Sequence, residues 1–299
     1  MNTWLEEFLH YVTAEKGYSK NTAMAYRNDL SQLVTYLADR AVFSWRDVTS
    51  AHILEYVHDL EAQGYASSTV ARKLATVKSF FHFLAIDGLV GDDPTVAVDF
   101  PLVDKRLPRP LTPEEMTRLL LEPAKSRTPR ALRDRAMLEL MYATGMRVSE
   151  VVGLEVDAVD LKAKEVHCPG AGNRERILPL YDRACEALSI YLEHGRPGLL
   201  RVQNERVQNE KVLFVSRLGK SLTRQGLWLI IKRYAEAAGI ERAVTPHTLR
   251  HSFAARLLDG DARLRQVQRL LGHTSIASTQ VYSKVSARRK QEARTETHS

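Results

Sequence analysis

The 299-residue sequence contains little cysteine and no long apolar run. Its two cysteines, Cys168 and Cys185, form no C-x-x-C pair, which excludes a disulfide-stapled secreted domain and a cysteine zinc cluster. No apolar stretch approaches the length of a membrane span, and residues 1–7 carry acid where a signal peptide carries base. We therefore expect a protein of the reducing cytoplasm that has no membrane partner.

Positive charge exceeds negative charge, and the excess is unevenly distributed. Lysine and arginine number 43 against 36 aspartate and glutamate residues, a formal net charge of +7. Residues 1–98 hold 8 basic and 12 acidic side chains, whereas residues 99–299 hold 35 and 24. This distribution favours a polyanionic partner for the C-terminal two-thirds of the chain.

The first 95 residues predict a compact domain of four amphipathic helices. Apolar side chains recur at helical spacing within 5–12, 26–37, 53–60 and 70–84, and Ser67 or Ser68 is a suitable N-cap for the fourth helix. These apolar positions form the expected core. The polar faces carry the candidate contacts to a polyanion, which are Lys20, Arg27, Arg72, Lys73 and Lys78.

A proline-rich stretch separates this domain from the next. Prolines at 94, 101, 108 and 110 break helical continuity, so we expect an interdomain linker over 96–110. The second domain then begins with a capping box at Thr112-Pro113-Glu114-Glu115 and extends over 111–285. Residues 286–299 form a polar C-terminal tail.

The second domain predicts helices with a small antiparallel sheet. Two short strands, 165–168 and 174–180, flank the predicted turn Gly170-Ala171-Gly172-Asn173, and 212–215 is a candidate third strand. Helical patterns cover 181–194, 223–238, 247–258, 264–271 and 275–282. The fold class is therefore mainly α with a small antiparallel β-sheet.

The segment Thr245-Pro246-His247-Thr248-Leu249-Arg250-His251 carries the strongest chemical signal. Thr245 can cap a helix with Pro246 in its first turn, which places His247 at the positive end of the helix dipole and Arg250 on the same face. An imidazole, a guanidinium and a helix N-terminus together suit a phosphate. A capped helix with a surface histidine and arginine is the alternative interpretation.

Three further segments each carry a weaker signal for a functional site when taken alone. Arg147 follows a helix stop at Gly145, and Glu150 is spaced to orient it, although an exposed ion pair would look the same. His273 follows Gly272 at another helix end. Tyr282 lies on a predicted helix, and a tyrosine on a helix usually serves in packing and not in catalysis.

In their order along the chain, R-x-S-E, H-x-L-R-H, L-G-H and T-x-x-Y, these pieces resemble the active site of the tyrosine recombinase (phage integrase) family. The length and two-domain layout are most similar to the Xer-type members. The resemblance implies an N-terminal SAM-like core-binding domain and a C-terminal catalytic domain. It implies site-specific recombination, with chromosome or plasmid dimer resolution as the expected role and phage or mobile-element integration as the alternative.

The resemblance also implies a role for each site residue. Tyr282 would attack a DNA phosphodiester to form a 3′-phosphotyrosyl bond, so no ATP or other cofactor would be needed. Arg147 and Arg250 would stabilise the phosphate oxygens, with Glu150 supporting Arg147. His247 would act as general acid or base near the tyrosine, and His273 would add a hydrogen bond to the phosphate. The DNA contacts would come from the five N-terminal cations named above together with Arg174 and Arg176.

One position departs from the family pattern. The family turn ordinarily reads G-K-G, with a lysine that protonates the leaving 5′-oxygen, whereas this chain has Ala171 there. Alanine has no proton to donate, so we expect normal DNA binding with slow cleavage, through either a deliberate or a natural substitution. In the alternative, Arg174 or Lys164 supplies the proton.

Two other classes compete with this interpretation. A metal-dependent nuclease would need clustered carboxylates, which the motif region lacks, so we expect no metal site. A non-catalytic DNA-binding protein would fit the charge and the helices. A phosphate-loop ATPase is excluded because no Gly-Lys-Ser/Thr sequence follows Gly170. The recombinase interpretation implies double-stranded DNA as partner and a homo- or hetero-tetramer on that DNA.

Overall fold

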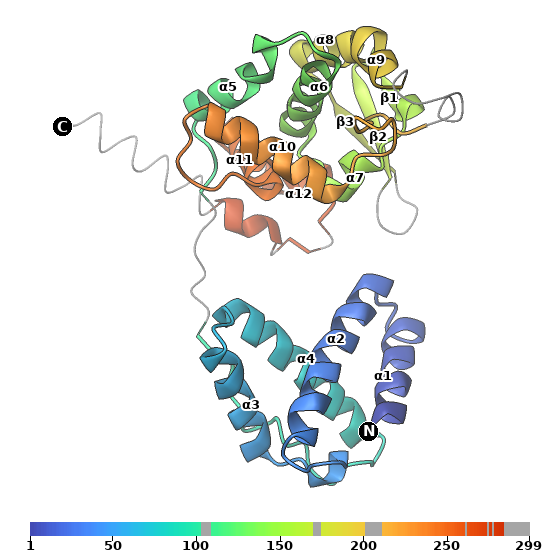
Figure 1. The fold of residues 1–299 in the computed structure, drawn as a ribbon, viewed down its shortest axis with the longest axis vertical. Helices are drawn as coiled ribbons and strands as arrows, with labels where there is room; N and C mark the ends of the chain where they lie inside the picture. The colour runs from blue at the N-terminus through green and yellow to red at the C-terminus, as the bar shows by residue number, and fades with distance from the viewer. Residues whose placement is uncertain are drawn as a thin grey trace, which may run out of the picture. The chain divides into compact units, whose positions relative to one another are not determined.

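The chain folds into two compact units, Met1–Arg106 and Leu107–Ser299 (Figure 1). The boundary between them falls within the predicted linker 96–110. The computed structural model describes residues 1–102, 109–169, 175–200, 211–260, 262–273, 275–276 and 278–283. In these ranges no helix is both long enough and apolar enough to cross a membrane.

The N-terminal unit is the predicted bundle of four helices. They are α1 (Asn2–Ala14), α2 (Lys20–Ala38), α3 (Ser50–Ala62) and α4 (Ser67–Ile86), with a short 3₁₀ turn η1 (Trp45–Asp47) between α2 and α3. Each helix contributes its apolar stripe to one core, in which Phe8, Leu33, Ile53 and Phe80 have no exposed surface. The prediction of a four-helix N-terminal domain is confirmed.

The predicted serine cap of α4 is wrong by one residue. Ala66, and not Ser67 or Ser68, is the N-cap, and it has no side-chain cap bond. The carbonyl of Ala66 accepts bonds from the N–H groups of Thr69 and Val70, at 2.8 and 3.1 Å, so Ser67 already lies inside the helix. Helix α2 differs, because there the side chain of Ser19 accepts a bond from Thr22 N–H.

The first helix of the C-terminal unit begins at the predicted capping box. Thr112 Oγ1 accepts from Glu115 N–H at 3.2 Å, and Glu115 Oε2 accepts from Thr112 N–H at 2.8 Å, which starts α5 (Pro113–Leu121). The remaining helical elements of the described part are η2 (Pro123–Lys125), α6 (Pro129–Thr144), α7 (Val148–Val152), η3 (Val156–Ala158), α8 (Asp182–Ile190), η5 (Tyr191–Gly195), α9 (Arg196–Leu200), α10 (Arg224–Ala237), α11 (Pro246–Asp259), α12 (Leu264–Leu271) and a short helix over 278–283.

A three-stranded antiparallel sheet packs against these helices. Its order is β1 (Val159–Asp160), β2 (Glu165–Pro169) and β3 (Glu175–Pro179), with His167 opposite Ile177. The strands β2 and β3 form the predicted hairpin. Val166 and Cys168 on β2 and Leu178 on β3 are fully buried, as the period of two along a strand requires.

The predicted third strand over 212–215 is wrong. This segment makes only isolated bridges, Glu155 to Val212 and Val215 to Ser221, and the third strand of the sheet is β1. Leu213, Phe214 and Val215 are all fully buried, so the segment is apolar because it crosses the core. The N–H of Leu213 bonds to Leu154 O at 2.7 Å, outside any ladder.

The predicted helix over 181–194 is longer and less regular than expected. Helix α8 continues into a π-helical turn, η5 (Tyr191–Gly195), and then into α9. The phenol of Tyr191 is buried and donates to Leu213 O at 3.0 Å. The π-helical turn therefore coincides with a hydrogen bond between this helix and the buried segment 212–215.

Two left-handed glycines end the helices that lead to the candidate site. Gly145 follows α6 with φ +61°, and Gly272 follows α12 with φ +61°. A Cβ on Gly145 would lie 2.3 Å from Cδ1 of Phe253 in α11, so α11 packs directly against this helix end. Glycine is therefore required at 145 for both its backbone conformation and its lack of a side chain.

Replacing Gly145 by alanine should destabilise the C-terminal unit more than the same change at Gly239. Gly239 has a similar φ of +65°, but no atom lies within 4 Å of an added Cβ. The control therefore measures left-handed strain alone, about 1 kcal/mol, whereas Gly145→Ala adds overpacking of about 1–3 kcal/mol. Urea unfolding of the two variants measures the difference, and equal losses would contradict the packing argument.

Candidate active site

The N-terminus of α11 has the predicted cap. Thr245 Oγ1 accepts from Thr248 N–H at 3.2 Å, Thr248 Oγ1 accepts from Thr245 N–H at 3.1 Å, and Pro246 occupies the first turn. His247 is exposed in this turn, and Arg250 follows one turn later. The cap therefore fixes the positions of His247 and Arg250, the two residues of this helix that are predicted to meet a phosphate.

Arg250 is buried and bridges two helix ends. Its side chain donates from Nη1 to Gly145 O at 2.5 Å and from Nη2 to Leu271 O at 2.6 Å, and the residue is only 5% exposed. Burial, with the nearby positive charge of Arg147, lowers the pKa of Arg250 to about 10. The guanidinium remains charged at neutral pH.

Glu150 supports Arg147 as predicted. Its Oε2 accepts from Arg147 N–H at 2.7 Å, and its Oε1 accepts from Arg147 Nη1 at 2.9 Å. Arg147 Nη2 also donates to Gly272 O at 2.9 Å. Burial alone would raise the pKa of Glu150, but the Arg147 N–H and the two guanidinium groups of Arg176 and Arg147 hold it below its usual range.

Arg176 lies inside the protein, although the sequence led us to expect that its side chain contacts DNA. Its side chain is 12% exposed and donates to Leu271 O at 3.1 Å, Glu150 Oε1 at 2.8 Å and Cys168 Sγ at 3.1 Å. The signal in the sequence is strand alternation, because Arg176 shares a face of β3 with buried Leu178. The contacts make Arg176 a partner of the Arg147–Glu150 pair.

Tyr282 is buried beside α11. It belongs to the short helix over 278–283, drawn in red in Figure 1, and is 5% exposed. Its hydroxyl lies 3.0 Å from Nδ1 of His251. Burial raises the pKa of Tyr282, while the positive charges of Arg250 and Arg147 oppose that shift. The structure therefore brings the predicted nucleophile together with the predicted arginines.

The ring of His273 stacks with that of Tyr282. The two rings stack with centroids 6.2 Å apart and planes 17° from parallel. Its Nδ1 lies 2.9 Å from Thr279 Oγ1. Burial and the charges of Arg250 and Arg147 lower the pKa of His273 to about 4, so its ring is neutral at pH 7.

His251 is the site residue that the sequence analysis missed. It belongs to the H-x-L-R-H motif, in which the sequence suggests a catalytic role for His247 alone. The ring of His247 lies 6.4 Å from that of His251, and it is His251 whose nitrogen reaches Tyr282. The available signal was the spacing of four residues from His247, which places both rings on one face of a helix.

Two of the predicted residues, Ala171 and Arg174, lie outside the described residues. Lys164, the alternative proton donor, is exposed and pairs with Asp182 at 2.6 Å. In the described part of the chain, no three histidine, cysteine, aspartate or glutamate side chains gather closely enough to hold a metal ion.

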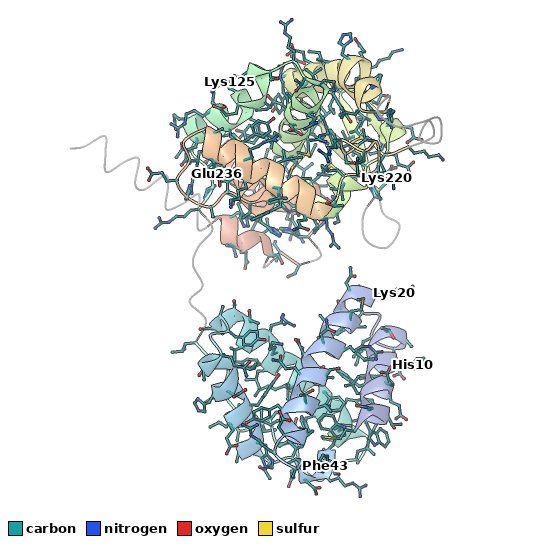
Figure 2. The ribbon with its side chains drawn as sticks, viewed as in Figure 1. His10, Lys20, Phe43, Lys125, Lys220 and Glu236 are labelled. Carbon is teal, nitrogen blue, oxygen red and sulfur yellow. The ribbon has the colours of Figure 1, made fainter. Side chains whose placement is uncertain are left out.

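The five N-terminal cations have different surroundings. Lys20 is exposed at the start of α2, where Figure 2 shows its side chain pointing away from the helices. Arg27 is exposed and paired with Glu6. Lys78 donates to Thr95 O at 2.9 Å.

Arg72 and Lys73 converge on a single buried carboxylate. Asp29 is 2% exposed and accepts from Arg72, from Lys73 at 3.1 Å and from Thr76 Oγ1 at 3.1 Å. Lys73 itself is 7% exposed, so it lies in the interior of the unit and not on the polar face where the sequence placed it. Arg72 remains half exposed.

The C-terminal cluster has the chemistry of a phosphate site with an oxygen nucleophile. Arg147 and Arg250 provide guanidinium donors, the neutral His273 provides a ring nitrogen, and Tyr282 provides a hydroxyl next to them. Guanidinium groups bind phosphate oxygens through paired hydrogen bonds. The arrangement can therefore hold a phosphodiester against a phenol.

Comparison with known proteins agrees with this chemistry. Residues 109–289 match the profile described as Phage integrase family, and residues 5–88 match Phage integrase, N-terminal SAM-like domain. The chain is 49% identical over 283 residues to tyrosine recombinase XerC of Roseiflexus castenholzii, covering 95% of this chain and 89% of that protein. It is 43% identical over 290 residues to tyrosine recombinase XerD of Halalkalibacterium halodurans, covering 97% and 95%.

Solved structures share the fold over most of the chain. A XerH site-specific recombinase bound to a palindromic difH substrate, in a post-cleavage complex, has a TM-score of 0.72 at 21% identity and covers 99% of this chain and 95% of that chain. The XerA recombinase has a TM-score of 0.54 at 25% identity, with 98% of both chains covered. On these matches, the chain belongs to the phage integrase family and is a tyrosine recombinase, an enzyme that transfers DNA strands.

Proposed function

We propose that this chain is a Xer-type site-specific recombinase whose nucleophile is Tyr282. The observation that carries the proposal is the position of the buried Tyr282 hydroxyl, 3.0 Å from His251 and facing the positive charges of Arg250 and Arg147. Similarity to both XerC and XerD relatives supports the resolution of chromosome or plasmid dimers, on DNA in the cytoplasm, over integration of a mobile element.

Cleavage would proceed by in-line displacement at phosphorus. The Tyr282 oxygen forms the bond to the 3′-phosphate while the bond to the 5′-oxygen breaks, and a partner strand's 5′-hydroxyl later reverses the exchange. Arg147 and Arg250 stabilise the charge on the non-bridging oxygens, and His273 adds a hydrogen bond. His247, exposed at the start of α11, acts as acid or base at the phosphate. The covalent link conserves the bond energy, so no ATP is consumed.

The partners follow from this chemistry. Exchange between two duplexes needs one active tyrosine for each of four strands, so four protomers assemble on two recombination sites. A solved neighbour at 18% identity is a lambda integrase tetramer bound to a Holliday junction, which shares the fold with this chain. The tetramer here is either four copies of this chain or two copies paired with two of a second recombinase.

Ala171 makes cleavage slow in this chain. The family lysine at this position would protonate the leaving 5′-oxygen, and alanine cannot. General acid catalysis is worth roughly 10²–10⁴-fold in rate. DNA binding depends on other residues and should remain normal.

Replacing Tyr282 by phenylalanine should abolish the covalent adduct while DNA binding persists. The probe is the duplex enriched when the chain is incubated with fragmented genomic DNA of its source organism, then rebuilt with a nick that traps the cleaved product. Denaturing gels measure the adduct, and gel shifts measure binding. A non-catalytic DNA-binding protein would form no adduct in either form, and an adduct that survives in Tyr282→Phe would contradict the proposal.

Replacing Ala171 by lysine should raise the rate of cleavage of the same nicked duplex by about 10²–10⁴-fold. The gain should vanish on a duplex whose leaving 5′-oxygen is replaced by sulfur, because a thiolate leaves without protonation. Ala171→Met is the matched control, since it has a long side chain and no proton. A gain with methionine, an equal gain with the sulfur duplex or no gain with lysine would each count against a missing general acid.

Replacing Lys20 by alanine should weaken DNA binding and reduce the slope of log Kd against log salt by about 1, as expected for one lost phosphate contact. Lys73→Met is the control. It removes a partner of buried Asp29, so it should lower the free energy of unfolding by about 1–3 kcal/mol and leave the salt slope unchanged. An unchanged slope for Lys20→Ala would remove Lys20 from the interface.

A further inference from the structure

The hydroxyl of Tyr282 has a specific partner on α11. His251 Nδ1 lies 3.0 Å from that hydroxyl, and the two rings are 5.2 Å apart at an angle of 54°. His251 directly follows Arg250, so neighbouring residues of one helix face the nucleophile and the predicted phosphate position. Tyr282 is 5% exposed, which leaves bulk water little access to its proton.

The surroundings of His251 keep its ring neutral. It is faced by His247 and Arg250 from its own helix, by His273 from the loop after α12, and by Tyr282 from the helix over 278–283. Burial, with the charges of His247 and Arg250, lowers the pKa of His251 to about 4. Arg250 has only donors to offer the phenol oxygen. In the tautomer of His251 that carries its proton on Nε2, Nδ1 is the acceptor for the Tyr282 hydroxyl.

We propose that His251 is the general base that takes the proton of Tyr282 during cleavage and returns it during rejoining, an inference that rests on Tyr282 being the nucleophile proposed above. In cleavage, the O–H bond of Tyr282 breaks and its proton moves to Nδ1 of His251. The phenol oxygen forms its bond to phosphorus as the bond from phosphorus to the 5′-oxygen breaks. In this chain, with Ala171, the 5′-oxygen takes its proton from water.

Binding of DNA would turn this weak base into a stronger one. The positive charge of Arg250 disfavours the protonated ring in the free protein. A phosphodiester bound to Arg147 and Arg250 brings a negative charge that offsets this effect and stabilises the imidazolium. Proton transfer is thereby coupled to occupation of the phosphate site. His247 is exposed in the first turn of α11, four residues before His251, and remains available to the phosphate.

Two substitutions separate proton transfer from mere positioning. His251→Phe keeps a ring and removes the acceptor, whereas His251→Asn keeps an acceptor near the Nδ1 position that takes no proton at neutral pH. Both should slow adduct formation on the saturating nicked duplex by about 10²–10⁴-fold, with unchanged Kd for DNA. The measurements are made in the full-length chain carrying Ala171→Lys and repeated in the unmodified chain, with thermal unfolding as the check on folding.

A fluorinated tyrosine at 282 provides the readout that a structural role would not move. A phenol acidic enough to be ionised at the assay pH needs no base, so it should narrow the gap between His251→Phe and its parent. Three results would overturn the proposal: His251→Phe cleaving as fast as its parent or faster, His251→Asn matching the parent, or a loss that the fluorinated tyrosine does not relieve. Tyr282→Phe runs in parallel, and an adduct in that variant would instead overturn the proposed nucleophile.

Discussion

The site depends on a buried cation held between two helix ends. Arg250 bonds Gly145 O at the end of α6 and Leu271 O at the end of α12. Carbonyls at helix ends lack partners within the helix and carry the negative end of its dipole, so a guanidinium both satisfies them and is stabilised by them. A buried cation without such partners would cost several kcal/mol. Two of its five N–H donors are used in this way, and its side chain also lies within hydrogen-bonding reach of the Tyr282 hydroxyl.

Charge balance around this cation prepares the site for an anion. Arg147, Arg176 and Arg250 lie close together, and among the described residues Glu150 is the carboxylate that bonds two of them. Burial, together with the positive charge of Arg250, lowers the pKa of both His251 and His273 and keeps their rings neutral. A phosphodiester would relieve this repulsion on binding. The affinity for DNA and the basicity of the histidines are therefore linked through one electrostatic balance.

Local signals in the sequence predicted much of this architecture. The caps at Thr112 and Thr245, and the helix ends at Gly145 and Gly272, follow from short-range geometry, and all four are present. The four-helix N-terminal unit and the β2–β3 hairpin follow from hydrophobic period in the same way.

What the sequence did not predict depends on contacts between distant residues. The sequence suggests that Lys73 is a surface cation, but in the structure Lys73 bonds to buried Asp29, which lies 44 residues earlier. The sequence suggests that Arg176 contacts DNA, but in the structure its guanidinium donates to Glu150 and to Leu271 O. His251 gains its significance from Tyr282, 31 residues later. In each case the side chain's own identity allowed two environments, and only tertiary packing selected one.

The most direct test of the account is to find the residue that carries the DNA in the trapped adduct. Digestion by trypsin and nuclease should yield residues 270–284, in which Tyr282 is the single tyrosine, with the mass of a 3′-linked nucleotide on its phenol. That result is what the arrangement of Arg147, Arg250, His251 and Tyr282 predicts. Nucleotide attached to any other residue, or linked through a 5′-phosphate, would contradict the account.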